Sequence, residues 1–384
     1  MPSLVVAVKA LPSRGTAPSV WTVTAFGVEE EFILLDPAGL GPRYIAREVI
    51  GRLSAAGEHA QEEFLACQVE CATSICSSLE QAAGELAQFR RELGSIAREQ
   101  GAVAAATGAP FTIDATPTIT EQSRYLAVAA EQGAITREHI VNGMHVHVEI
   151  PDRESGVHAL NALRSWLPTI VALSGNSPFW QGDDSAFASW RTIQMRRWTT
   201  QGCPPHFADA ADYAARTENL VGLGGTTDIP LIAWNARLSS KHPTLEVRAS
   251  DAQLTVRHAV TIAGAVRGLV VRALADLAEG RTTGADAAPP PEVLESAVWH
   301  AARYGTRSML VDPRTGELVA ARVAVEALLA HAEPALVEEG DLEEVGSGLE
   351  RLLSEGTGAD AQREAYRRGG VPALASLFAE SLVE

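Results

Sequence analysis

The chain has 384 residues, 46% of them hydrophobic and 21% charged, so it can bury a substantial core as one large or two ordinary domains. Its formal net charge of −17 excludes nucleic acid as the main partner, because phosphate binding needs a surplus of Lys and Arg. Small anionic substrates remain compatible with this charge if metal ions supply the positive charge.

The N-terminal residues 1–20 hold Pro, Ser, Gly and Thr without periodicity, which predicts a flexible head. Their apolar run "LVVAV" lacks the basic flank and the cleavage site of a signal peptide, and no apolar stretch reaches the roughly 18 residues of a membrane span. The four cysteines form no C-x-x-C pair, which favours buried reduced thiols over a zinc site or a disulfide framework. We therefore expect a soluble, cytoplasmic protein without a membrane partner.

Strands are predicted where β-branched and aromatic residues, often alternating with polar ones, lie between turn signals. These segments are 22–36, 62–75, 102–111, 143–151, 229–239 and 243–251. The last two are joined by "SKHP", which indicates a hairpin. A further small hairpin is expected at "SMLVDPRTGELV", residues 308–319.

Helices are predicted where apolar residues recur at helical spacing. The segments are 77–101, 155–180 (where the helix runs into a Gly/Asn/Ser/Pro loop), 251–280 and most of the chain beyond Glu292. The first of these helices is predicted to begin at a capping box of Ser77 with Glu80 and to stop at Gly101. "TTGADAAPPPE", residues 282–292, has the composition of a linker.

Strands and helices are mixed without strict β-α-β alternation, which favours an α+β fold with a mainly antiparallel sheet. The predicted division is a head over 1–20, an α+β core over 21–284 and a mainly helical C-terminal region over 292–384 packed on the core. Because the chain contains neither G-x-G-x-x-G nor a P-loop, the common nucleotide folds have no local support.

Three predicted strands carry charged or metal-binding residues two positions apart, which places each pair on one face of its strand. The pairs are Glu29 with Glu31, His145 with His147, and Glu246 with Arg248. If these strands are neighbours, the pairs converge on one polar surface, where dense carboxylates repel one another unless cations compensate them. Oxygen ligands with one imidazole suit Mg²⁺ or Mn²⁺, and such ions can hold ATP without a P-loop.

Simpler interpretations stay open at this point. A glutamate pair on an edge strand is often only a solvated face, and an H-x-H pair is often structural. Glu30 faces away from Glu29 and Glu31 and requires a separate, structural explanation. The residues alone do not decide between these interpretations and a metal–phosphate site.

Seven motifs in a fixed order carry a resemblance to a known family. They are "GVEEEF", "EFLACQVECAT", "GMHVHV", "LSGNSPFWQG", "WNAR", "PTLEVRASDAQ" and "RYG…LVDPRTG". From about Phe26 to the C-terminal "GTGADAQR", the chain resembles the carboxylate–amine ligase family often labelled glutamate–cysteine ligase type 2. The resemblance implies a catalytic core similar to that of glutamine synthetase, with an antiparallel half-funnel and two or more divalent ions.

The resemblance also implies a reaction and metal ligands. The reaction is ATP-dependent amide formation, with glutamate as the expected acid, through an acyl phosphate that an amine attacks. The implied metal ligands are Glu29, Glu31, Glu63, Glu70, His145 and Glu246. Glu70, with Glu63, would complete one metal position beside Glu31. His145 and Glu246 would join Glu29 around another.

Two arginines receive catalytic roles from the same resemblance. Arg248 would meet the γ-phosphate or the substrate carboxylate, because a guanidinium suits such anions, and Arg237 would steady the transferring phosphoryl group. Implied substrate- or ATP-binding residues are Arg124, His147, Arg191, Arg197 and Asn235. His147 or a nearby carboxylate would accept the proton of the amine.

One departure from the family pattern concerns the substrate. The family usually reads Trp-Asp-x-Arg-Pro where this chain has Trp234, Asn235, Ala236, Arg237 and Leu238. The missing carboxylate at Asn235 suggests a specialised amine other than cysteine. Competing hypotheses are a guanidino-kinase-like phosphotransferase and a catalytically inactive nucleotide-binding homologue. We expect small-molecule acid and amine substrates and a homo-oligomer, a dimer.

Overall fold

A computed structural model of the chain describes residues 23–54, 57, 59–281 and 289–384. The predicted head over 1–20 and residues 282–288 of the predicted linker lie outside the described residues. The division into a core over 21–284 and a C-terminal region over 292–384 therefore stays a prediction.

Within the described ranges, seven strands form one antiparallel sheet in the order β2-β3-β1-β5-β9-β8, with β4 paired to the end of β1. They are β1 (Phe26–Leu35), β2 (Ala60–Glu62), β3 (Gln68–Ala72), β4 (Val103–Ala105), β5 (Gly143–Glu149), β8 (Ala236–Leu238) and β9 (Thr244–Asp251). Two small hairpins are β6 (Phe179–Trp180) with β7 (Asp183–Asp184), and β10 (Met309–Val311) with β11 (Leu318–Ala320). The predicted α+β class with a mainly antiparallel sheet is confirmed.

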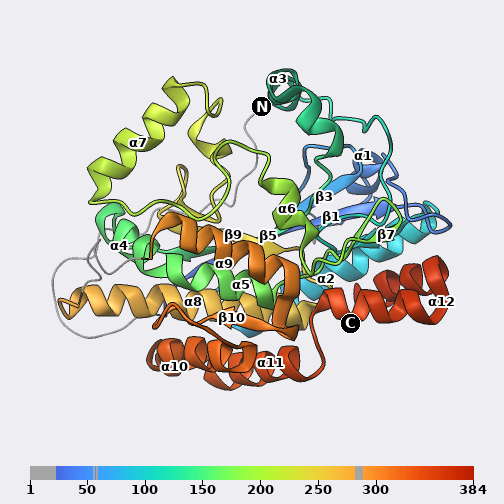
Figure 1. Cartoon of the computed structure of the whole chain (residues 1–384). Coiled ribbons are helices and arrows are strands. Elements are labelled where there is room, and N and C mark those ends of the chain that lie inside the picture. Colours follow the sequence, from blue (N-terminus) through green and yellow to red (C-terminus); the bar gives the residue numbers. More distant parts are fainter. Residues whose placement is uncertain (1–22, 55–56, 58, 282–288) are drawn as a thin grey trace.

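The helices surround this sheet (Figure 1). The α-helices are α1 (Ala46–Ile50), α2 (Leu79–Glu99), α3 (Ser123–Gln132), α4 (Arg153–Leu163), α5 (Leu167–Leu173), α6 (Trp190–Met195), α7 (Ala210–Gly222), α8 (Val256–Ala278), α9 (Pro291–Tyr304), α10 (Ala321–Glu339), α11 (Leu342–Ser354) and α12 (Gly358–Ser381). The 3₁₀ turns are η2 (Gly133–Glu138), η3 (Arg164–Trp166), η4 (Ile229–Leu231) and η6 (Gly305–Arg307).

Helix α8 forms the middle of the helical layer behind the sheet. It contacts α2 and α4, and on its other side it contacts α10 and α11 (Figure 1). Its side chains are buried along most of its length, as expected for a helix that is apolar all round and lies between two layers. Even so, no helix in the described part of the chain is long and apolar enough to cross a membrane.

The back face of β1 explains Glu30. Arg90 of α2 donates from Nε to Glu30 Oε2 at 3.0 Å and from Nη2 to Oε1 at 2.5 Å, and both side chains have 0% exposure. Arg90 also donates to the carbonyls of Gln253 and Leu254, just before α8. Glu30 is therefore a buried structural charge that joins β1, α2 and the start of α8.

Helices α3 and α7 stand on the other side of the sheet from α8, α10 and α11 (Figure 1). The sequence predicts only a polar loop where α3 lies, and no element where α7 lies. Both helices bury few residues: Val128 in α3, and Tyr213 and Thr217 in α7. Helices with such a small buried face leave a weak periodic signal in the sequence.

Several element predictions differ from the structure, and the strand predicted over 102–111 is only the short β4. The helix predicted over 155–180 is divided into α4 and α5 by the turn η3, with Pro168 in the first turn of α5 because proline cannot donate to an earlier carbonyl. The strand predicted over 62–75 is two strands, β2 and β3. The strand predicted over 229–239 contains η4 and only the short β8.

Candidate active site

The register of the sheet places charged residues opposite one another across five strands. Glu31 of β1 lies opposite Glu70 of β3, and Glu29 lies opposite His145 of β5. His147 lies opposite Glu246 of β9, which in turn lies opposite Arg237 of β8. Residues directly opposite in antiparallel strands have their side chains close together. The result is a continuous polar row on the face that Glu30 does not share.

A bulge in β9 is part of this alignment. The pairing of β5 with β9 shifts register between Met144 and Val146, so that Arg248 and Ala249 of β9 face the single residue His145. The shift brings Glu246 opposite His147, while His145 lies opposite Glu29 of β1. A bulge that aims a side chain is common beside active sites.

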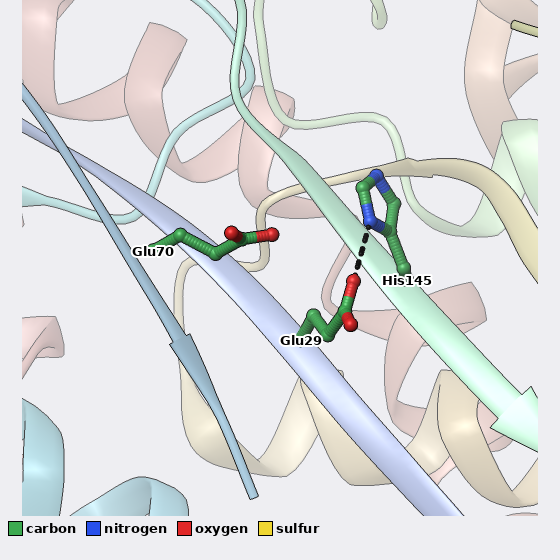
Figure 2. A group of neighbouring side chains, drawn as sticks. All are labelled: Glu29, Glu70 and His145. Atoms are coloured by element: carbon green, nitrogen blue, oxygen red, sulfur yellow. Dashed lines mark hydrogen bonds and ion pairs between the residues drawn. The ribbon is translucent and has the colours of Figure 1, made fainter. Parts of the chain in front are cut away.

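One candidate metal position is formed by Glu29, Glu70 and His145. Each residue offers a ligand atom, and these atoms all lie within 4.8 Å of one another. Figure 2 shows the three side chains extending from three neighbouring strands toward a common point, with His145 Nδ1 3.1 Å from Glu29 Oε2. Two carboxylates and an imidazole match the ligand preferences of Mn²⁺ and Mg²⁺.

A second candidate position is formed by Glu29, His147 and Glu246, again with ligand atoms within 4.8 Å of one another. His147 Nε2 lies 3.4 Å from Glu29 Oε1 and 4.0 Å from Glu246 Oε1. This nitrogen is buried and has no hydrogen bond of ordinary geometry among the described residues, whereas the other ring nitrogen contacts Thr244. A buried ring nitrogen held in this way between two carboxylates suits a cation, and Glu29 belongs to both positions.

The carboxylates at the β2–β3 end of the row repel one another. Burial and the charge of Glu31 raise the pKa of Glu63 to about 7. Burial and the charges of Glu63 and Glu29 raise the pKa of Glu70 well above its usual value. Such crowding of buried like charges is what a bound divalent cation would relieve, so the residues present fit a metal site.

The β8–β9 end of the row is rich in arginine. Arg237 donates to Glu246 from Nε at 2.8 Å and from Nη2 at 3.1 Å, and Arg248 also donates to this carboxylate. Although burial opposes it, these two guanidinium groups lower the pKa of Glu246 well below its usual value. Arg191 of α6 donates from Nη2 to the carbonyl of Arg248 at 3.2 Å. The carboxylate of Glu246 therefore pairs with two guanidinium groups, and the positive charge that it does not neutralise is available for an anionic substrate.

Gly143 lets the two ends approach. Its N–H donates to Glu31 Oε2 at 2.5 Å. A Cβ at this position would lie 2.5 Å from Nη2 of Arg191 and 3.2 Å from Nε2 of His145. Glycine is therefore required for the close approach of backbone and side chains, which no spacing rule indicates from the sequence.

Three residues predicted to bind substrate or ATP lie outside this row. Arg124 pairs with Asp228 at 3.4 Å, and both side chains are exposed. Arg197 pairs with Glu138, and both line a cavity of about 730 Å³ beside α6 and η2. Asn235 is buried, and its Oδ1 accepts a hydrogen bond from Gln201 at 2.8 Å.

The metal grouping also differs in detail from the sequence expectation. His147, expected to bind substrate or take a proton, belongs to the second metal group, whereas Glu31 and Glu63 belong to neither group. Two contacts were missed altogether: Gln61 donates to Glu70, and Tyr125 donates to Glu63 Oε2 at 3.1 Å. Gln61 lies opposite Glu70 in the β2–β3 register, so only strand pairing could reveal it.

Comparisons with known proteins give a consistent family. The model of glutamate–cysteine ligase family 2 (GCS2) matches residues 25–379. A relative from Nocardia farcinica (strain IFM 10152), named "Putative glutamate--cysteine ligase 2-1", is 38% identical over 92% of this chain and 91% of its own length. A relative from Rhodopirellula baltica, named "Putative glutamate--cysteine ligase 2", is 35% identical over 94% of this chain and 97% of its own length.

Solved structures share the fold at low sequence identity. The crystal structure of glutamate–cysteine ligase from Francisella tularensis in complex with AMP matches 95% of this chain and 90% of that chain, with a TM-score of 0.69 and 11% identity. A bifunctional glutathione synthetase from Pasteurella multocida matches 94% of this chain and 52% of that chain, with a TM-score of 0.65 and 14% identity. These two matches establish the similarity of fold.

Proposed function

Because the chain belongs to glutamate–cysteine ligase family 2, we propose that it is an ATP-dependent carboxylate–amine ligase that forms a γ-glutamyl amide through an acyl phosphate. The observation that carries this proposal is the row of facing residues from Glu70 to Arg237 on one sheet face. Its carboxylate end suits divalent cations, and its arginine end suits phosphate and carboxylate groups. Phosphoryl transfer needs this combination more than it needs a covalent nucleophile.

Two Mg²⁺ or Mn²⁺ ions are proposed as cofactors. Glu29, Glu70 and His145 would hold one, and Glu29, His147 and Glu246 would hold the other. When bound, the ions would neutralise the clustered carboxylates and the charge on the phosphates of ATP. The nearby Glu31 and Glu63 would remain available to hydrated ions.

The chain's own residues then supply alignment and charge. In the first step, an oxygen of the substrate carboxylate attacks the γ-phosphorus of ATP, and ADP leaves. Arg248 and Arg237, held by Glu246, would stabilise the negative charge on the transferring group. In the second step, the neutral amine attacks the acyl carbon, the C–O bond to phosphate breaks, and inorganic phosphate leaves. A carboxylate of the site would accept the proton that the amine loses.

We propose that the amine differs from cysteine. Asn235 carries no charge, and its amide is hydrogen-bonded to Gln201 rather than to an arginine. Its backbone carbonyl accepts from the N–H of Arg248 at 2.7 Å, so it lies beside the arginine end of the row. A neutral amide in this place favours a different acceptor from the one that a carboxylate would favour.

The testing experiment is an ADP-release screen of candidate acids crossed with candidate amines, in the presence of Mg²⁺ and ATP. We expect ADP and phosphate only when one acid and one amine are both present. A stable phosphorylated product from a single co-substrate would instead establish a kinase. Absence of Mg²⁺–nucleotide binding in calorimetry would establish an inactive homologue. Asn235→Asp is the matched variant for testing which amine the enzyme accepts. Efficient use of cysteine by the unaltered chain would refute the proposal of a specialised amine.

Location and assembly complete the proposal. The cysteines Cys67, Cys71, Cys76 and Cys203 are free, which suits a reducing cytoplasm where ATP is available. A homodimer remains our expectation, and size-exclusion chromatography with light scattering would test it.

A further inference from the structure

The first turn of α3 is connected to both ends of the polar row through one intermediate residue or turn on each side, although it contributes no member to the row. Tyr125 and Arg124 are consecutive residues of this turn. Tyr125 reaches the carboxylate end, through Glu63. Arg124 reaches toward the arginine end, through Asp228.

On the carboxylate side, the hydroxyl of Tyr125 orients the carboxylate of Glu63. Glu63 lies just beyond β2, and its N–H still donates to the carbonyl of Gln68 of β3 at 3.3 Å, so its backbone is held while its carboxylate needs a side-chain partner. The hydroxyl of Tyr125 donates to Glu63 Oε2 at 3.1 Å, and Thr120 donates to the Glu63 carbonyl at 2.5 Å. A neutral donor on one carboxylate oxygen orients the group and leaves the other oxygen available to a cation.

On the arginine side, the connection runs through η4. Arg124 pairs with Asp228, and Asp228 Oδ1 caps η4 by accepting from Leu231 N at 2.9 Å. The carbonyls of Pro230, inside this turn, and of Ile232, directly after it, both accept from Nη1 of Arg237.

Arg237 therefore has a bidentate contact with Glu246 on one side and a carbonyl cradle on the other. The cradle is built from a short 3₁₀ turn whose cap residue is itself tied to α3. Movement of that turn would change the direction of the Arg237 guanidinium, while Glu246 stays in β9.

We propose that the first turn of α3 is a positioning element of the ligase. Tyr125 aims Glu63 at the metal-binding end, and Arg124 with Asp228 holds the η4 cradle that aims Arg237. Neither Tyr125 nor Arg124 is a catalytic residue, since each acts through another side chain. This inference rests on the proposed metal- and ATP-dependent function.

The first test examines the role of Tyr125 at the metal-binding end of the row. Mn²⁺ binding is measured by electron paramagnetic resonance for the full-length protein, Tyr125→Phe and the control Tyr44→Phe. Tyr44 is a suitable control because the charged and ionisable groups around its hydroxyl are Cys67 and Asp114, which do not belong to the polar row. We expect Tyr125→Phe to weaken Mn²⁺ binding by about tenfold and Tyr44→Phe to leave it unchanged. Equal affinities for all three proteins would overturn the role of Tyr125.

The second test examines the role of Arg124 and Asp228 at the arginine end of the row. Arg124→Ala and Asp228→Asn should each lower kcat several-fold while leaving Mn²⁺ affinity unchanged. Arg124→Lys, which keeps a cation opposite Asp228 and leaves the η4 cap in place, should retain most of the wild-type kcat. Arg322→Ala serves as a control because Arg322 forms a remote, similarly exposed ion pair with Glu350. A wild-type kcat in both single variants would overturn the role of Arg124. An equally lowered kcat in the control Arg322→Ala would overturn it as well.

The experiments distinguish failure of the proposed positioning role of α3 from failure of the proposed ligase function. If the unaltered protein binds no Mn²⁺ and releases no ADP with any acid and amine, the proposed function itself fails. If the unaltered protein does both and the α3 variants match it, only the positioning role fails.

Discussion

Three consecutive glutamates of β1 have two different roles because side chains alternate along a strand. Glu29 and Glu31 face the open side with the histidines, and Glu30 faces the helices and pairs with Arg90. The same residue type is thus tolerated twice in an apolar strand for different reasons. On one face a proposed cation compensates the charge, and on the other a buried guanidinium does so.

Glu29→Gln is predicted to abolish turnover and leave the fold intact. Glu29 belongs to both candidate metal positions, and the amide cannot supply the negative charge that a divalent ion needs. We expect ADP release to fall by about a hundredfold or more, with a circular dichroism spectrum like that of the unaltered protein. A normal rate in this variant would rule out the metal assignment.

Glu30→Gln is predicted to have the opposite effects: it destabilises the fold and leaves metal binding unchanged. It leaves Arg90 as a fully buried charge with one partner removed, which costs about 3–5 kcal/mol of folding free energy. Because the side chain points to the back of the sheet, Mn²⁺ affinity should stay within about twofold of the unaltered protein, the additivity error expected for an independent site. Urea unfolding and electron paramagnetic resonance measure the two quantities, and unchanged stability would contradict the interpretation.

Among the elements, the start of α2 shows how far local signals reach. The sequence predicts a capping box of Ser77 with Glu80, but the structure places the cap one residue later. Ser78 has extended backbone angles, and its hydroxyl accepts from Gln81 N at 3.2 Å. Both serines satisfy the sequence pattern, so only the tertiary position of the chain entering the helix distinguishes them.

Ser78→Ala is predicted to destabilise the protein by about 1 kcal/mol, since an N–H of the first turn loses its acceptor. Ser77→Ala is the matched control and should have almost no effect, because Ser77 is exposed and lies outside the cap. Urea denaturation of both variants measures the difference. Equal losses in the two variants would show that the cap is not at Ser78.

Strand pairing explains why some elements were predicted well and others were not. The strands β1, β5 and β9 have at least seven residues each. β5 and β9 alternate polar and apolar residues, and β1 ends in the apolar run 32–35 before a turn, which are strong local signals. β2 and β8 have three residues each and are formed because neighbouring strands offer free edges. Elements of that length depend on context and are not predictable from local pattern.

For the molecule as a whole, the carboxylates of the polar row and the adjacent Glu63 couple folding to pH. Burial and neighbouring carboxylates raise the pKa of Glu63 to about 7 and that of Glu70 well above its usual value. A carboxyl group whose folded-state pKa is raised contributes stability below its unfolded pKa, near about 4.3, and loses it as pH rises through the folded pKa. Without metal, the contribution of these two carboxyl groups to stability should therefore fall between about pH 4.5 and pH 8.

The measurement is thermal unfolding of the metal-free protein at about pH 5 and pH 8, with and without Mg²⁺. We expect Mg²⁺ to raise the melting temperature more at the higher pH, because ions bind the deprotonated carboxylates. Glu63→Gln should raise the metal-free melting temperature at the higher pH relative to that at the lower pH by a few degrees, because it removes one carboxyl group whose contribution falls with pH. A pH dependence of Glu63→Gln equal to that of the unaltered protein would contradict this account.

The sequence by itself determined which residues share a face of each strand. Alternation at period two is local, so counting positions along the chain is enough to pair Glu29 with Glu31, His145 with His147, and Glu246 with Arg248. The ordered motifs also indicated the family that the match over residues 25–379 confirms. Local alternation cannot say which pairs meet, however, because that depends on strand order and register.

Only the tertiary structure decided which residues form each group. The bulge in β9 brings Glu246 opposite His147, and the register of β1 with β5 places Glu29 beside His145, so Glu29 belongs to both metal groups. Long-range contacts assign Arg124 to Asp228, and Tyr125 to Glu63, across 104 and 62 positions of sequence. Contacts between residues so distant in the chain arise from packing of whole elements, which no local spacing encodes.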